Sequence, residues 1–120
     1  MKILLKGIIL CSIGVLGFIT IAEASLTQSE FKQYVNAYYD LLEKQQSEIG
    51  QALDRRENTS IIISKSCAYV GTLKRFENYA LKNRHLTAAQ EEAAFIKELR
   101  LSFEPSFKDF GTSSHKACKA

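Results

Sequence analysis

The sequence predicts an all-α fold: a small bundle of three to four helices, stapled by one disulfide, that follows a cleaved signal peptide. Three observations lead to this prediction. Apolar residues recur at steps of three and four in three separate segments, which is the spacing of one face of an α-helix. The 120 residues include a single Pro, so little interrupts these segments. Two cysteines remain once the leader is removed, which is enough for one disulfide.

Residues 1–24 have the features of a secretion signal. Lys2 and Lys6 precede an apolar run that ends in Ala22-Glu23-Ala24, a small-x-small cleavage site. A permanent membrane anchor is the alternative, but the run is shorter than the roughly 20 residues that span a bilayer. We expect cleavage after Ala24. Residues 25–120 then form a single helical domain, periplasmic or secreted, with no stable membrane span.

The mature chain keeps Cys67 and Cys118, whereas Cys11 lies within the leader. An oxidising compartment favours joining an even pair of cysteines. The bond would stabilise the fold by roughly 4 kcal/mol through the entropy of the closed loop. Two free thiols or two metal ligands remain as alternatives.

The first helix is predicted from Gln28 to Arg56. Thr27 and Glu30 have the spacing of a capping box, in which each side chain bonds the other residue's backbone amide. The inward stripe that follows is Phe31, Val35, Tyr38, Leu42, Gln45, Ile49 and Ala52.

A second helix is predicted after the polar break at residues 54–58, with Thr59 or Ser60 as its cap and its end near Asn83-Arg84. The three β-branched residues 61–63 could instead open a short strand. The positions expected to face inward include Ile63, Cys67, Val70, Leu73, Phe76 and Ala80.

The third helix is predicted to start at a capping box formed by Thr87 and Gln90. Pro105 should end or kink this helix, and a short helical turn should follow before Gly111. The polar tail after Gly111 should fray unless Cys118 pins it along the second helix. The inward stripe of the third helix is Phe95, Ile96, Leu99 and Phe103.

Catalysis and cofactor binding are not expected. The two histidines, His85 and His115, lie beside no recognisable nucleophile motif, and their spacing to the cysteines fits no familiar zinc or haem pattern. No glycine-rich phosphate loop occurs. A formal net charge of +3 is too small to indicate a nucleic-acid-binding protein.

Charge is unevenly distributed along the chain. Residues 28–57 carry four basic and six acidic side chains, whereas residues 60–86 carry five basic and one acidic. The basic side chains of the second helix could meet an acidic partner or anionic lipid, although an ordinary solvated face is the simpler interpretation. Three tyrosines crowd the first helix, so Tyr39 or Tyr34 should stay partly exposed, as is favoured at interfaces.

One set of segments resembles a known family. The segments are Ser66-Cys67-Ala68-Tyr69-Val70-Gly71, then Leu86-Thr87-Ala88-Ala89-Gln90, then Phe95-Ile96 and Leu99. They resemble the small exported helical immunity proteins that protect bacteria from peptidoglycan-amidase toxins of type VI secretion systems. The resemblance implies that Cys67 and Cys118 are the family's structural pair and that the protein binds a toxin without catalysis of its own. Asn83-Arg84-His85 stands where the family often has a Cys-Pro pair.

We therefore expect an exported, non-enzymatic protein-binding module, most concretely a periplasmic immunity protein that occludes a secreted cell-wall amidase. The alternative is a helical carrier that encloses a lipid or another apolar ligand between Phe95, Phe103, Phe107 and Phe110. The loops at residues 54–60 and 83–87 are candidate contact points, because loops on a rigid scaffold often carry recognition. The residues expected to contact a partner are Tyr39, Arg55, Arg56, Lys74, Arg75, Lys82, Arg84 and His85.

Overall fold

The computed structural model describes residues 27–119, so the predicted signal peptide and its cleavage site lie outside the described residues. The described chain is helical and contains no strand, which confirms the predicted fold class. The β-branched residues 61–63 belong to a helix, so the alternative of a short strand there is wrong. The helices are α3 (Gln28–Asp54), α4 (Thr59–Lys82), α5 (Thr87–Phe103), α6 (Pro105–Lys108) and α7 (Ser114–Ala117).

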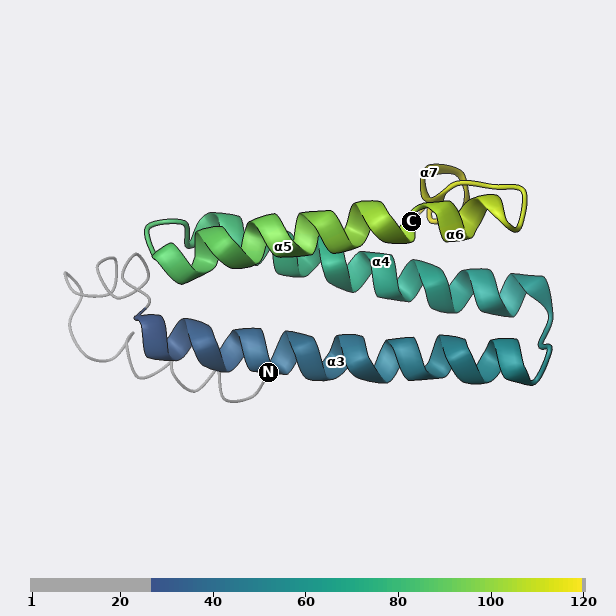
Figure 1. Ribbon diagram of the computed structural model, residues 1–120, viewed down its shortest axis with the longest axis horizontal. Coiled ribbons are helices and arrows are strands. Elements are labelled where there is room, and N and C mark those ends of the chain that lie inside the picture. Colours follow the sequence, from purple (N-terminus) through teal and green to yellow (C-terminus); the bar gives the residue numbers. More distant parts are fainter. Residues whose placement is uncertain (1–26, 120) are drawn as a thin grey trace.

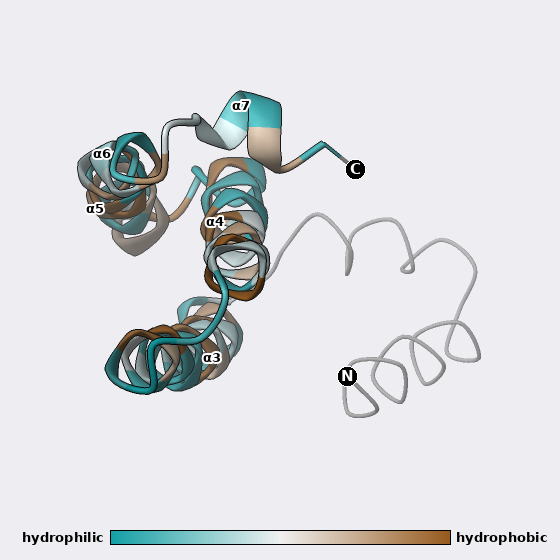
Figure 2. Cartoon of the chain, turned by 90° about the vertical axis from the view of Figure 1, so that its right-hand side faces the viewer, coloured by the Kyte–Doolittle hydropathy of each residue, from teal (hydrophilic) through white to brown (hydrophobic). Residues whose placement is uncertain are grey.

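Helix α4 is the centre of the molecule. It lies between α3 and α5 in both views, and it contacts each of them along its length, whereas α3 and α5 hardly contact each other (Figures 1 and 2). The break at Pro105 occurs as predicted, and α6 continues from the end of α5 (Figure 1). Helix α7 packs back on α4, so the polar tail is held against the second long helix. No helix among residues 27–119 is both long enough and apolar enough to cross a bilayer.

The starts of the three long helices differ in how they are capped. Thr27 and Glu30 form the predicted capping box of α3, with the Thr27 hydroxyl accepting from the Glu30 amide at 3.1 Å. The predicted cap of α4 is wrong, because Asn58 takes that place and its side chain accepts from the Ser60 amide at 3.1 Å.

The capping box predicted for α5 is also wrong. Leu86 is the N-cap and makes no side-chain bond, so Thr87 is already helical. The side-chain Nε2 of Gln90 instead donates to the Arg84 carbonyl at 2.7 Å and thereby connects the preceding turn to the helix.

Helix α3 ends two residues earlier than predicted, in a Schellman turn. The Glu57 amide donates to the Ala52 carbonyl and the Arg56 amide to the Leu53 carbonyl, at 3.0 and 3.1 Å. Arg56 adopts φ 52°, a left-handed conformation that favours glycine. The reversal places α4 alongside α3 after only four intervening residues, 55–58.

The buried face of α4 is wider than the predicted stripe, because the helix packs against α3 on one side and α5 on the other. Its first half was predicted in the wrong register: Ile63 and Cys67 are half-buried, whereas Ile62 and Ser66 are buried. The buried residues from the second half of α4 are Tyr69, Val70, Thr72, Leu73, Phe76 and Ala80.

Aromatic rings join α3 to α4. Tyr38 stacks on Phe76 with ring centroids 4.7 Å apart, and Phe31 stacks on Tyr79 at 5.6 Å. Phe95 of α5 was predicted to face inward, but 54% of it is exposed. The reason is that α3 and α5 make few contacts with each other, so α3 does not cover this side of α5, although the Tyr39 ring lies 6.4 Å from the Phe95 ring.

Candidate functional site

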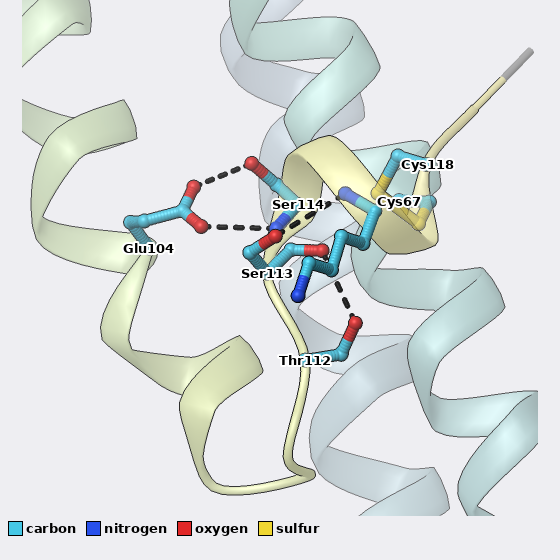
Figure 3. The surroundings of a disulfide bond; sticks show 7 residues. Cys67, Glu104, Thr112, Ser113, Ser114 and Cys118 are labelled. Carbon is cyan, nitrogen blue, oxygen red and sulfur yellow. Dashed lines mark hydrogen bonds between the residues drawn. A yellow bond between two sulfur atoms is a disulfide. The ribbon is translucent and has the colours of Figure 1, made fainter.

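A disulfide joins Cys67, in the middle of α4, to Cys118 at the end of α7 (Figure 3). The Cα atoms are 5.3 Å apart and the residues are separated by 51 positions in the sequence. The predicted pair is thus confirmed, and neither sulfur is a free thiol or a metal ligand. Residues 27–119 contain no group of three or more His, Cys, Asp or Glu side chains that could hold a metal ion.

Glu104 fastens the other end of α7. Its carboxylate accepts hydrogen bonds from the Ser114 amide at 2.9 Å and from the Ser114 hydroxyl at 2.5 Å (Figure 3). These two bonds, with smaller contributions from Lys74 and Lys108, hold the pKa of the Glu104 carboxyl below its usual value. The tail is therefore fixed at both ends, by an ionic hydrogen-bond pair at Ser114 and by a covalent bond at Cys118.

The fixed tail forms one wall of a groove of about 820 Å³ on the face of α4 that points away from the core. We call it the basic groove. Its floor is made of small side chains of α4, including Ser64, Ala68 and Gly71, and its tail wall is Ala117, Cys118 and Lys119. This volume lies within the range of about 300–1,000 Å³ that is typical of ligand pockets.

Among the described residues, the rim of the basic groove carries three cations and no carboxylate. Lys74 and Arg75 come from α4 and Lys119 comes from the tail. The Arg75 guanidinium is folded across the groove floor: its Nη2 donates to the Thr72 hydroxyl at 3.1 Å, and its Nη1 lies 3.5 Å from where a Cβ on Gly71 would stand. The Arg75 guanidinium therefore lies close over Gly71.

Gln45 of α3 closes the remaining edge of the groove. Its Nε2 donates to the Ala68 carbonyl at 3.4 Å, a long hydrogen bond, and its buried Oε1 has no partner among residues 27–119. The side-chain amide is therefore weakly held.

The outward face of α4 has no exposed carboxylate along its whole length. Its one acidic residue, Glu77, is half-buried and pairs with Arg100 of α5 at 2.9 Å. Beyond the basic groove, a second hollow of about 480 Å³ is lined by Asn78, Leu81, Lys82 and Arg84. The positive charge predicted for this part of the chain therefore lies on one helix and continues into the turn that follows it.

The residues predicted to contact a partner lie in separate places. Arg55 and Arg56 are exposed in the turn before α4, and Lys82, Arg84 and His85 lie at and just beyond its end. Since α4 has 24 residues and is about 36 Å long, these two groups lie at opposite ends of the molecule. Lys74 and Arg75 lie between them, and the structure brings only these two together with the disulfide, in the basic groove.

Tyr39 is half-buried and has an internal partner. Its hydroxyl donates to the Glu92 carboxylate at 2.6 Å, and its ring lies edge-on to Phe76 with centroids 5.2 Å apart. Burial, followed by the bond to Glu92, raises the pKa of this hydroxyl. Tyr39 thus links α3 to α5 through its hydroxyl group.

Sequence reasoning missed Lys119, Gln45 and Glu104. Lys119 follows Cys118 directly, so its position beside α4 was implied by the predicted disulfide. Gln45 was assigned to the inward stripe of α3, and no pattern marked it as a groove residue. Glu104 precedes Pro105, and nothing in the sequence indicated that it would meet Ser114.

The four phenylalanines of the carrier alternative do not line either groove. Phe107 is buried and packs edge-on against Phe103, with centroids 5.9 Å apart, and Phe103 in turn contacts Tyr69 at 4.8 Å. Phe95 is mostly exposed on the side facing α3. Phe103 and Phe107 therefore pack in the core, whereas Phe95 does not.

Comparison with protein-family models, with curated proteins and with solved structures finds no match to this chain. The resemblance to amidase-immunity proteins therefore stays a prediction.

Proposed function

We propose that this protein is an exported, non-enzymatic binding module that recognises another protein through the outward face of α4. The observation that supports this proposal is the basic groove, a hollow whose wall is fixed by the Cys67–Cys118 bond and whose rim carries cations alone. A rigid wall favours binding, because little conformational entropy is lost when the partner docks. The disulfide supports export, since such bonds persist in oxidising compartments.

The partner that we propose is a secreted peptidoglycan amidase, and the role is that of a periplasmic immunity protein that occludes the amidase's active site. The resemblance of the segments around Cys67 and Thr87 to that family supports this finer assignment. An inhibitor of this kind needs a stiff scaffold and complementary charge, both of which the face of α4 offers.

The test uses the oxidised chain, purified from the periplasm, together with the amidase encoded nearest to its gene. Hydrolysis of purified peptidoglycan is measured with increasing amounts of the chain, and binding is measured by titration calorimetry. We expect stoichiometric inhibition with one binding site. An amidase that keeps full activity and shows no binding heat in a tenfold excess of the chain would contradict the proposal.

A further inference from the structure

We propose that the basic groove receives an acidic loop or chain end of the partner protein, with the partner's carboxylates paired to Lys74, Arg75 and Lys119. This inference rests on the proposed function, because it assigns the binding site of that module and the chemistry of the segment that enters it. The occupant is an extended peptide that carries Asp or Glu side chains.

Charge is the first argument for this occupant. The groove is lined by three cationic side chains and by no acidic one. Elsewhere on α4 the one carboxylate is paired with Arg100, so no acidic group on this helix competes for the rim. Lys74 also lies near Glu104, whose carboxylate is already held by Ser114. The groove therefore has an excess of positive charge that a carboxylate-bearing segment would neutralise.

The shape of the floor is the second argument. Ser64, Ala68 and Gly71 have short or absent side chains, so a peptide backbone can approach α4 closely. The Gln45 side-chain amide borders the groove with a long donor bond and, among the described residues, an unpartnered Oε1. A peptide backbone carries both N–H and C=O groups and could complement such an amide, whereas a fully ionised carboxylate only accepts hydrogen bonds.

The orientation of Arg75 argues for an inserted segment over a membrane surface. Its guanidinium is bonded to the Thr72 hydroxyl at 3.1 Å and lies over Gly71, so it is held against the groove lining although the residue is exposed. A flat bilayer reaches cations that protrude from a protein, whereas a loop or chain end can enter a groove between a helix and a tail. An acidic peptide is thus the better fit.

The test measures the fluorescence anisotropy of a labelled peptide of alternating Asp and Gly, titrated with the oxidised full chain. The matched peptide of alternating Asn and Gly serves as the neutral probe. We expect the acidic peptide to bind at least tenfold more tightly than the neutral one. We also expect amide shifts in ¹⁵N spectra to be confined to α4 residues 60–75 and tail residues 117–119. Equal binding of the two peptides, absence of binding, or shifts elsewhere would overturn the inference.

Two pairs of variants separate the groove from general charge and from folding. The triple variant Lys74→Gln, Arg75→Gln, Lys119→Gln should lose at least tenfold in affinity, whereas Lys32→Gln, Lys44→Gln, Lys97→Gln, with the same charge change at exposed positions, should stay within twofold. Gly71→Leu should block the groove, whereas Gly50→Leu, in open space on α3, should not. Thermal unfolding confirms that each variant is folded. Equal losses in the members of either pair would overturn the inference.

Other occupants are tested in parallel with vesicles of three parts phosphatidylcholine to one part phosphatidylglycerol and with sedimentation velocity of the chain alone. If the wild-type chain binds vesicles and the triple groove variant does not, the occupant of the groove is lipid and the peptide proposal is wrong. If the wild-type chain is a dimer and the triple groove variant is a monomer, the occupant is a second copy of the chain and the peptide proposal is again wrong. Inhibition of the amidase distinguishes this inference from the proposed function. If the triple groove variant still inhibits the amidase fully, the assignment of the groove as the binding site is wrong but the proposed function stands. If the wild-type chain does not inhibit the amidase, the proposed function itself is wrong.

Discussion

Tyr39 is the side chain that links the two outer helices. Helices α3 and α5 hardly contact each other, yet the Tyr39 hydroxyl reaches Glu92 of α5 and its ring contacts Phe95. A hydrogen bond to a charged, partly buried acceptor stabilises more than one between neutral groups. The position of α5 relative to α3 should therefore depend on this hydroxyl.

Tyr39→Phe is predicted to lower the free energy of unfolding by about 1–2 kcal/mol, measured by urea denaturation. Tyr79→Phe is the matched control, because the Tyr79 hydroxyl is buried without a hydrogen-bond partner among the residues described. Burial raises the pKa of that hydroxyl, and its removal relieves an uncompensated desolvation. Tyr79→Phe should be neutral or stabilising, and a greater loss in Tyr79→Phe than in Tyr39→Phe would contradict this account.

For single residues, the sequence predicted some side-chain exposures correctly but not which side chains a neighbouring helix would cover. The half-exposure of Tyr39 followed from three tyrosines too close together for one stripe, and the structure confirms it. Phe95 was assigned to the core because it fits a helical stripe, but a stripe says nothing about whether a neighbouring helix comes near enough to cover it. Gln45 and Glu104 acquire their roles only from partners 23 and 10 positions away in the sequence.

The turn between α3 and α4 carries local strain at Arg56. A non-glycine residue in the left-handed region costs about 1–2 kcal/mol, and here it stands where Schellman turns usually place glycine. Arg56→Gly is predicted to raise the free energy of unfolding by about 0.5–1 kcal/mol, after the greater chain entropy of glycine is subtracted. Guanidine denaturation measures the change.

Gly111 provides the opposite control, since it has φ 74° with open space around its Cβ position. Gly111→Ala should therefore destabilise through backbone strain alone. A loss of stability in Arg56→Gly would show that the arginine side chain makes contacts that outweigh the strain.

The attachment of α7 at Glu104 makes part of the stability dependent on pH. The folded pKa of Glu104 is lowered by its bonds to Ser114, so the unfolded chain binds the proton more readily. This contribution is fully present above the ordinary value of 4.5 and is lost as pH falls through the lower folded pKa. Glu104→Gln should cost about 1–2 kcal/mol at pH 7 and progressively less below pH 4.5, because the wild type loses its advantage there.

The free energy of unfolding of wild type and of Glu104→Gln is measured by urea denaturation between pH 7 and pH 3. The difference between the two free energies isolates the contribution of Glu104 from that of the other carboxylates. Glu98→Gln, which makes the same charge change at an exposed position of α5, is the control. A difference between wild type and Glu104→Gln that stays constant over this range would contradict the assigned role.

At the scale of elements, the apolar spacing predicted where the helices lie, and Pro105 predicted where α5 ends. The caps of α4 and α5 were predicted wrongly, because several adjacent polar residues could each cap and the choice depends on the path of the turn. The register of the first half of α4 was also wrong. A helix with neighbours on two sides buries a broad face, for which a single stripe is an inadequate template.

The whole molecule depends on the bond between α4 and the tail. Closing a loop across 51 positions should stabilise the fold by about 4 kcal/mol on the chain-entropy model. The double variant Cys67→Ser, Cys118→Ser should lose approximately this amount in urea denaturation, and wild type treated with a reducing agent should match it. In both samples the amides of residues 113–118 should exchange faster with solvent, because the tail is then held only by the bonds to Glu104 and by the packing of α7 on α4.

The same variant connects the fold to the proposed function. Without the bond, the tail wall of the basic groove is no longer fixed, so the binding of the acidic peptide should weaken while α3, α4 and α5 remain helical by circular dichroism. A reduced chain with unchanged stability and unchanged peptide binding would show that the tail does not form the site.

The proposed binding face requires that the chain is exported and that its tail is covalently bonded to α4. Both requirements are tested by the intact mass of protein purified from the periplasm and alkylated with iodoacetamide under denaturing, non-reducing conditions. We expect a chain that begins at Ser25 and carries no alkyl group. A chain that retains residues 1–24, or one that gains an alkyl group on both Cys67 and Cys118, would contradict it.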